Sequence, residues 1–114
     1  MALGIERHDG EGAISVIILR GKLMLGEDCN QLEAVIPELL SAGRTKLIFD
    51  LSGVTHIDST GIGRFIDTYS RLMKVSGKMR LAGASGAVRD SFRVTRLDTV
   101  FSFFPTVEEA RAGL

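Results

Sequence analysis

A short, almost continuously apolar run at residues 46–51 (KLIFDL) constrains the fold more than any other segment of the chain. It has the length of a strand but lacks the regular polar–apolar alternation of a strand that faces water on one side. Strands of this kind lie at the centre of parallel sheets, where helices cover both faces. The run therefore predicts an α/β fold in which residues 46–51 form a central strand, followed by a polar turn at 52–53.

Two strands are predicted ahead of this run. Residues 13–19 are rich in β-branched side chains and end at Arg20-Gly21, a pattern typical of a strand. Leu3 and Ile5 precede a turn signal at Asp9-Gly10, which predicts an antiparallel partner for that strand. The remaining strands are expected at residues 79–82 and 100–104.

A first helix is predicted after Gly26 and is expected to end at Gly43, because apolar residues recur there at helical spacing. Asp28 is expected to cap this helix, and Pro37 to kink or break it. The inward stripe consists of Cys29, Leu32, Ile36, Leu39 and Leu40.

A second, amphipathic helix is predicted to follow residues 57–61 and to end at Gly77. Its apolar face comprises Ile62, Phe65, Ile66, Tyr69, Leu72 and Met73, and its solvated face comprises Arg64, Asp67, Arg71 and Lys74. Two shorter helices are predicted, one at residues 88–94 and one that starts at Pro105 and carries Val107 and Ala110.

The predicted order is β-β-α-β-α-β-α-β-α, which favours a mixed, mostly parallel sheet with helices packed on it and right-handed crossovers. A length of 114 residues suits one domain, and we expect a single α/β domain over residues 1–114.

Composition excludes several classes of protein. One cysteine, Cys29, allows no internal disulfide, and two histidines, His8 and His56, leave little material for a metal centre, so we expect no metal and no cofactor. No apolar run approaches the roughly 20 residues that span a bilayer, and the first residues lack the pattern of a secretory leader. We therefore expect a cytoplasmic protein without membrane insertion, in which Cys29 is a buried small apolar residue.

The 14 basic and 14 acidic residues balance, but they are unevenly placed. Between Arg64 and Arg96 the chain has eight basic and two acidic residues, an asymmetry that can steer a protein partner. Few aromatic residues accompany these charges, and the chain as a whole is neutral, so we do not expect nucleic acid as a partner.

The segment THIDSTGIG at residues 55–63 has the only site-like chemistry in the sequence. It lies where a predicted strand leads into a helix, at the strand end where open α/β sheets bind their ligands. Asp58 or Ser59 would cap the helix, and Gly61 and Gly63 would allow close approach. A simpler interpretation also remains open, in which the pair only caps the helix and the glycines only ease packing.

Enzymatic functions fit the segment poorly. A G-x-S-x-G elbow is absent because Ile57 stands two residues before Ser59, and His56, Asp58 and Ser59 are too close in sequence for a catalytic triad. A P-loop motif is absent as well, which leaves only a helix end that could hold an anion. We expect no catalytic residue, with nucleotide binding or hydrolysis as the weakest alternative.

The chain resembles the STAS domain, in particular the small bacterial anti-sigma factor antagonists, over nearly its whole length. The resemblance rests on LIFDLSGV at residues 47–54, IDSTGIG at 57–63 and FPTVEEA at 104–110. The D-S-[ST]-G element after such a strand is the most specific of these features.

The resemblance implies a protein that binds an anti-sigma factor, often itself a serine kinase, and so frees a sigma factor. The kinase would phosphorylate Ser59, the serine after the aspartate, and a serine phosphatase would reset the switch; Thr60 is a second hydroxyl that follows one residue later. It also implies a monomer that pairs with other proteins. The implied partner-binding residues are Asp58, Ser59, Thr60, Gly61, Ile62, Gly63 and Arg64.

One position departs from the family pattern. Many antagonists have Gly-x-Leu-Asp in the loop near the signature, whereas this chain reads Gly21-Lys22-Leu23-Met24, with Glu27 and Asp28 slightly later. The departure keeps a second hypothesis open, a non-switching scaffold subunit of a stressosome-like or lipid-transport complex.

Overall fold

The computed structural model describes residues 4–114, apart from the side chains of residues 27 and 28. The predicted order of strands and helices is confirmed. The elements are β1 (Gly4–Asp9), β2 (Ile14–Leu23), α1 (Glu27–Ser41), β3 (Lys46–Ile57), α2 (Ser59–Lys74), β4 (Lys78–Ala82), α3 (Gly86–Val94), the 3-10 helix η1 (Leu97–Thr99), β5 (Ser102–Phe104) and α4 (Val107–Arg111). Leu3, expected in the first strand, lies outside the described residues.

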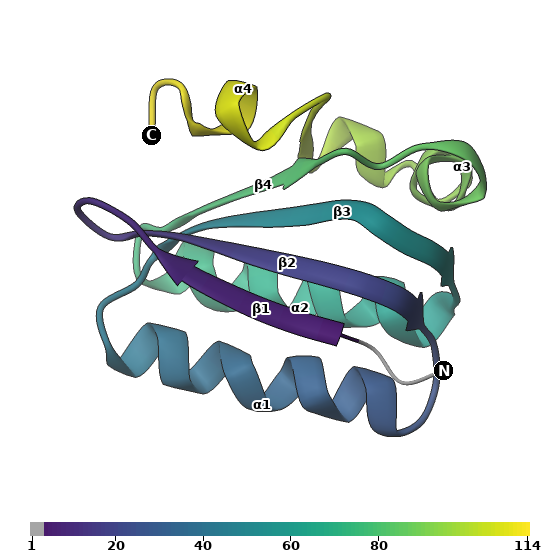
Figure 1. The fold of residues 1–114 in the computed structure, drawn as a ribbon, viewed down its shortest axis with the longest axis horizontal. Coiled ribbons are helices and arrows are strands. Elements are labelled where there is room, and N and C mark those ends of the chain that lie inside the picture. The colour runs from purple at the N-terminus through teal and green to yellow at the C-terminus, as the bar shows by residue number, and fades with distance from the viewer. Residues whose placement is uncertain (1–3) are drawn as a thin grey trace.

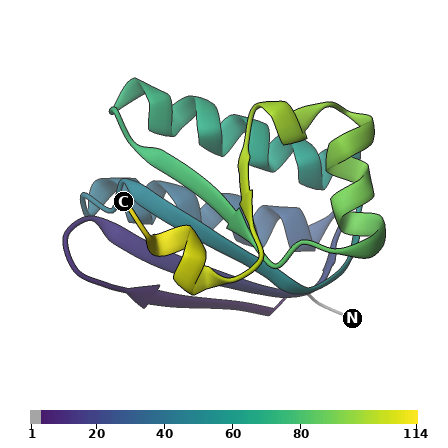
Figure 2. The same ribbon diagram turned by 90° about the horizontal axis from the view of Figure 1, so that it is seen from above.

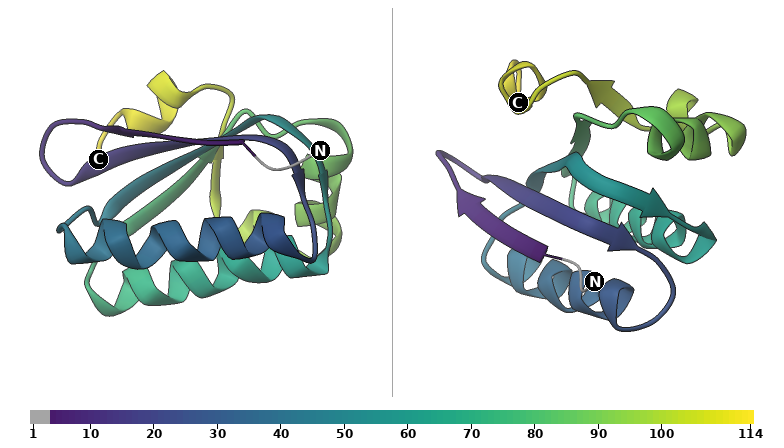
Figure 3. Two further views of the ribbon diagram at one scale, coloured as in Figure 1. Left: turned by 60° about the horizontal axis from the view of Figure 1, so that its bottom comes forward. Right: turned by 45° about the vertical axis from the view of Figure 1, so that its right-hand side comes forward.

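The five strands form one mixed sheet in the order β1-β2-β3-β4-β5 (Figure 1). Only the β1–β2 pair is antiparallel, and the other three neighbours are parallel. Helices α1 and α2 cover one face, while α4 lies on the other (Figures 1 and 3). Helix α3 lies at the end of the sheet where β3 leads into α2 (Figure 2). This α/β arrangement agrees with the predicted fold class.

The central strand β3 is buried on both faces, as its apolar run predicts. Leu47 and Phe49 belong to the large core between the sheet and the two long helices, whereas Ile48 belongs to a small core under α4. Phe65 of α2 packs between two rings, with its centroid 5.3 Å from that of Phe49 and 5.8 Å from that of Phe92 on α3. These edge-on contacts join α2 and α3 to the centre of the sheet.

Strand β3 continues for six residues beyond Leu51, where the sequence predicted its end. The turn expected at residues 52–53 is therefore wrong, because both residues belong to the strand. The parallel pairing of β2 and β3 continues to Leu23 and Ile57 through two register shifts, so neither strand ends where its apolar pattern ends. A Cβ at Gly53 would lie 2.9 Å from Arg20 Cγ, which means that this glycine permits close strand contact instead of a turn. The additional length carries the chain to Asp58.

Helix α1 differs from its prediction at two points. Of the kink or break expected at Pro37, the break does not occur, because Ile36 and Leu39 beside the proline are buried in the core and hold both halves in place. Its N-cap is Gly26 and not Asp28, because the helix already begins at Glu27. Gly43 follows the helix with a φ of 75°, as a terminating glycine does.

Smaller differences concern the second half of the chain. Ile66 and Met73, predicted on the buried face of α2, are 47% and 56% exposed, since the sheet and α3 cover only part of that face. Helix η1 was not predicted, and β5 begins at Ser102 instead of residue 100. Helix α2 ends at Lys74, and the last helix is capped by Thr106, one residue after Pro105.

No helix within residues 4–114 combines the length and the apolar character that crossing a bilayer requires.

Phe65→Ala is expected to lower the free energy of unfolding by about 3–5 kcal/mol, because it empties a fully buried position between two rings. The neighbouring Ile66→Ala is the matched control and should change stability by no more than about 0.5 kcal/mol, because its side chain is half exposed. Urea unfolding, monitored by circular dichroism, measures the free energy of unfolding of both variants. Equal losses in the two variants would contradict the packing of α2.

Candidate functional site

The THIDSTGIG segment lies where β3 passes into α2, at the carboxyl end of the parallel strands. Asp58 is the N-cap of α2, with extended backbone angles, and Ser59 is the first helical residue. Of the two capping residues that the sequence allows, Asp58 is therefore the cap, and Ser59 is left exposed at the helix start.

Asp58 joins two segments that are far apart in the sequence. Its Oδ1 atom accepts a hydrogen bond from the Gly61 N–H at 2.9 Å, and its Oδ2 atom accepts one from the Leu25 N–H at 2.8 Å. Its own N–H donates to the Leu23 carbonyl oxygen at 3.3 Å. The start of α2 is thus tied to the end of β2 and to the loop that leads into α1.

These contacts keep the Asp58 carboxylate ionised. Burial raises the pKa of the carboxyl, but the backbone N–H groups of Gly61, Leu25 and Thr60 outweigh it, so this pKa lies below its usual value. Because both oxygens already accept backbone hydrogen bonds, the geometry favours an orienting role for Asp58 over a contact with a partner's cation.

The two glycines of the signature have different roles. A Cβ at Gly61 would overlap the Leu23 carbonyl oxygen and lie 2.9 Å from Ile57 Cγ1, so the missing side chain is needed for packing inside the molecule. A Cβ at Gly63 would meet nothing within 4 Å. Of the two, only Gly63 leaves open space beside the helix for another molecule to approach.

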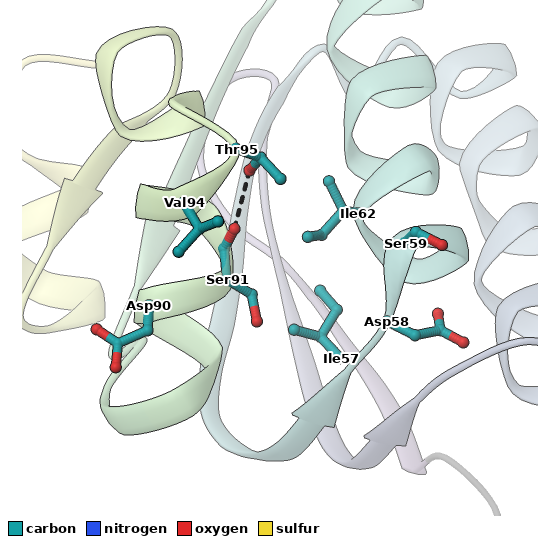
Figure 4. Close-up of a pocket in the computed structure, with 8 residues that line it drawn as sticks. All are labelled: Ile57, Asp58, Ser59, Ile62, Asp90, Ser91, Val94 and Thr95. Carbon is teal, nitrogen blue, oxygen red and sulfur yellow. Dashed lines mark hydrogen bonds between the residues drawn. The ribbon is translucent and has the colours of Figure 1, made fainter.

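A groove of about 400 Å³ lies beside Ser59, between the start of α2 and helix α3 (Figure 4). Ile57, Ile62 and Val94 supply its apolar lining, and Ser59 and Asp58 stand on the α2 side. Its lining residues from α3 and the turn after it are Asp90, Ser91, Val94 and Thr95. None of these four was predicted as a site residue, because only the packing of α3 beside α2 brings them there.

Comparison with known proteins identifies the family. A family model of the STAS domain matches residues 7–110. The chain belongs to the STAS domain family.

Similar proteins include anti-sigma factor antagonists. A Thermotoga neapolitana protein named as an anti-sigma factor antagonist homologue is 29% identical over 76 residues, which is 67% of each chain. The crystal structure of an anti-sigma factor antagonist from Mycobacterium paratuberculosis has a TM-score of 0.82 at 25% identity, covering 96% of this chain and 91% of that one. Bacillus SpoIIAA in its phosphorylated form has a TM-score of 0.76 at 24% identity, covering 94% and 96%.

Arg64 of this STAS domain lies apart from the groove. Its guanidinium is 3.3 Å from the Glu33 carboxylate of α1, and the side chain is 29% exposed, so it lies between the two long helices and not on a solvated outer face. The remaining residues of the signature stay together: Ser59 is exposed, Thr60 is half-buried, and Ile62 is buried at the groove.

The other residues considered from the sequence have local contacts. His56 is exposed and its Nδ1 lies 2.9 Å from the Thr55 hydroxyl, which confirms a local hydrogen bond. Cys29 is buried and its thiol donates to the Met24 carbonyl oxygen, as expected for a small core residue. Among the described side chains, no group of three His, Cys, Asp or Glu residues could hold a metal ion.

Gly61→Ala is expected to destabilise the STAS domain by about 1–3 kcal/mol, because the new methyl group would push α2 away from Leu23. Gly63→Ala should leave stability unchanged or raise it by up to about 1 kcal/mol, since the site is open and alanine favours a helix. Thermal melts of the two variants provide the comparison. A loss of stability in Gly63→Ala as large as that in Gly61→Ala would show that this distinction is wrong.

Asp58→Ala is expected to cost about 1–2 kcal/mol of stability near neutral pH, because it removes the helix cap. Since the folded pKa is lowered, the contribution is complete above the unfolded value of about 3.9 and is lost as the pH falls through the folded pKa. The gap in unfolding free energy between wild type and variant should therefore close on acidification. An exposed carboxylate of α2, Asp67, serves as control, and a gap that persists in acid would refute the role of the Asp58 carboxylate.

Proposed function

We propose that this chain is an anti-sigma factor antagonist. It binds an anti-sigma factor while Ser59 is unmodified and is released when Ser59 is phosphorylated. The proposal is carried by one observation: an exposed serine is the first residue of α2, at the edge of a groove and directly after the capping residue Asp58. Relatives named as anti-sigma factor antagonists support it.

The position of Ser59 suits a surface switch. A phosphate group adds about −1.5 to −2 charges, and the start of a helix stabilises negative charge through its dipole. Phosphorylation can therefore leave the fold unchanged while it alters the surface that a partner contacts. Bacillus SpoIIAA, which shares this fold, is known in a phosphorylated form, in agreement with such a mechanism.

The proposed partners follow from this role. An anti-sigma factor with serine kinase activity would bind and modify the chain, and a serine phosphatase would restore it, in the cytoplasm. The contact surface would comprise Ser59, Thr60, Ile62 and Gly63. Asp58 and Gly61, also implied by the resemblance, would orient the helix start, and Arg64 would contribute from the side of α1. Residues 1–114 would act as a single, monomeric domain that binds proteins, without a catalytic group, cofactor or nucleic acid.

A second candidate is a scaffold subunit that does not switch, in a stressosome-like or lipid-transport assembly. Met24 favours it, because this partly exposed thioether replaces the acidic residue that many antagonists have in the same loop. On this hypothesis Ser59 is only the first residue of a capped helix, and binding is independent of its charge.

Capture from a lysate of the source organism separates the two candidates. Wild type should retain an anti-sigma factor, and so should the control variant Ser70→Asp, which changes an exposed serine on the same helix. Ser59→Asp should bind that protein at least about tenfold more weakly, a difference of about 1.4 kcal/mol in binding free energy. Mass spectrometry identifies the retained protein, and calorimetry with that purified protein measures the affinity. Retention of the same non-kinase assembly by all three baits would support the scaffold.

Incubation with that anti-sigma factor and ATP then tests the modification itself. The phosphate should map to Ser59 and be absent from Ser59→Ala, while Thr60→Ala should be modified like wild type. Modification of another residue with Ser59 spared would refute the switch.

A further inference from the structure

The excess of basic residues between positions 64 and 96 has no part in the proposed function. Five of the eight have contacts within the domain: three form ion pairs, one donates to backbone carbonyl groups and one lies over an aromatic ring. They are Arg64, Arg71, Arg93, Arg80 and Arg89. The side chains of the other three, Lys74, Lys78 and Arg96, have neither an ion pair nor a hydrogen bond within residues 4–114. Two of these three cations lie close together in the sequence, where α2 ends and β4 begins.

A second groove, of about 490 Å³, lies beside Lys78 at this end of the domain. Its charged lining consists of Lys78 and Arg80, and within the described part of the chain no carboxylate lines it. The Arg80 guanidinium already donates to the carbonyl oxygens of Ala110 and Ala112, at 2.9 and 2.5 Å. The Lys78 ammonium is therefore the cation of this groove that can pair with another molecule.

The groove also has exposed apolar side chains. Met73 of α2 is 56% exposed, and Val100, just before β5, is 48% exposed. Tyr69 lies between them in the lining, and its ring packs on that of Phe101 with the centroids 5.3 Å apart. Single exposed apolar residues are common on protein surfaces, but two that line one groove beside an unpaired lysine provide both a hydrophobic contact and a charge.

Backbone hydrogen bonds keep the end of α2 in place. The Leu72 carbonyl oxygen accepts from the N–H groups of Val75 and Gly77, at 3.1 and 2.7 Å, and the Met73 carbonyl oxygen accepts from Ser76 at 3.3 Å. These carbonyl groups carry the negative end of the helix dipole, so their pairing within the turn weakens their repulsion of an anion. The groove is thus formed before any partner binds.

This groove is remote from the serine of the proposed function. Ser59 begins α2 and Met73 is near its end, so at 1.5 Å per residue roughly 20 Å of helix separates them. Figure 1 shows the two ends of α2 at opposite sides of the sheet. A molecule in this groove therefore need not compete with a partner at Ser59.

We propose that this groove docks an acidic segment of a partner protein other than the anti-sigma factor, so that the domain holds two proteins at once. An apolar side chain of that segment packs between Met73 and Val100, and a carboxylate beside it pairs with Lys78. Charge complementarity selects this occupant, because two cations without a carboxylate attract an acidic segment and oppose a basic one. The recessed shape suits a protruding side chain better than the flat surface of a lipid bilayer.

An NMR titration of the isotope-labelled chain tests the proposal. The probe is a short synthetic peptide with leucine and phenylalanine between pairs of glutamate residues, and the matched control peptide has glutamine in place of glutamate. The glutamate peptide should shift the backbone amide signals of residues 69–80 and 100–102. It should bind about threefold or more tightly than the glutamine peptide at low salt, and added salt should reduce this preference.

Two variants separate the charge from the apolar contact. Lys78→Gln should remove most of the preference for the glutamate peptide, and Met73→Ser should weaken both peptides about threefold or more. The matched controls are Lys22→Gln and Val94→Ser, which change an exposed lysine and an exposed valine outside this groove, and both should bind like wild type. Ser59→Asp should also bind the peptide like wild type, so the result does not depend on the proposed function.

Several outcomes would overturn the proposal. Equal affinity for the two peptides, an unchanged preference in Lys78→Gln, or shifts confined to the groove beside Ser59 would each show that the site is wrong. Shifts of the same amides on concentrating the chain alone would assign the groove to a second copy. Loss of these signals on adding phosphatidylcholine–phosphatidylglycerol vesicles, without any effect of the peptide, would assign it to a lipid surface.

Discussion

The Asp58 carboxylate is the contact on which the candidate site depends. One oxygen caps α2 through Gly61 and the other holds the backbone of Leu25, so a single side chain sets the position of the helix start and of the neighbouring loop. Hydrogen bonds to a charged group are stronger than neutral ones, and here they lower the pKa of the carboxyl that accepts them. The position of Ser59 at the helix start is therefore fixed by the contacts of Asp58, and the serine side chain itself has no part in fixing it.

The pairing of the strands determines where the Asp58 contact lies. The pairing of β2 with β3 continues through two register shifts, so that Leu23 and Ile57 are neighbours and Gly61 packs directly on the Leu23 carbonyl. The helix start is thereby locked against the sheet on its inner side, while Gly63 and Ser59 remain free on the outer side. A modification at Ser59 can change the outer surface without disturbing the packing beneath it, which is what a switch without a conformational change requires.

The groove beside Ser59 combines apolar side chains with two carboxylates. Arg64, the Lys or Arg residue nearest to Ser59 in the sequence, is paired with Glu33 on α1 and does not line this groove. Its apolar lining consists of Ile57, Ile62 and Val94, and the carboxylates of Asp58 and Asp90 line it as well.

The sequence by itself determined the order of the elements, the doubly buried strand at residues 46–51, the family signature and the exposed serine at a helix start. The order of the elements and the buried strand follow from local composition and periodicity, whereas the role expected for Ser59 follows from the family resemblance. The sequence did not predict the length of β3, the continuity of α1 through Pro37 or the different roles of Gly61 and Gly63. Nor did it place Val94 at the groove beside Ser59. Only the tertiary structure decided these points, because each depends on contacts between residues that are distant along the chain. The pairing of β2 with β3 continues beyond the apolar pattern, and core packing keeps α1 continuous despite its proline. The role of each glycine depends on the atoms that lie opposite it.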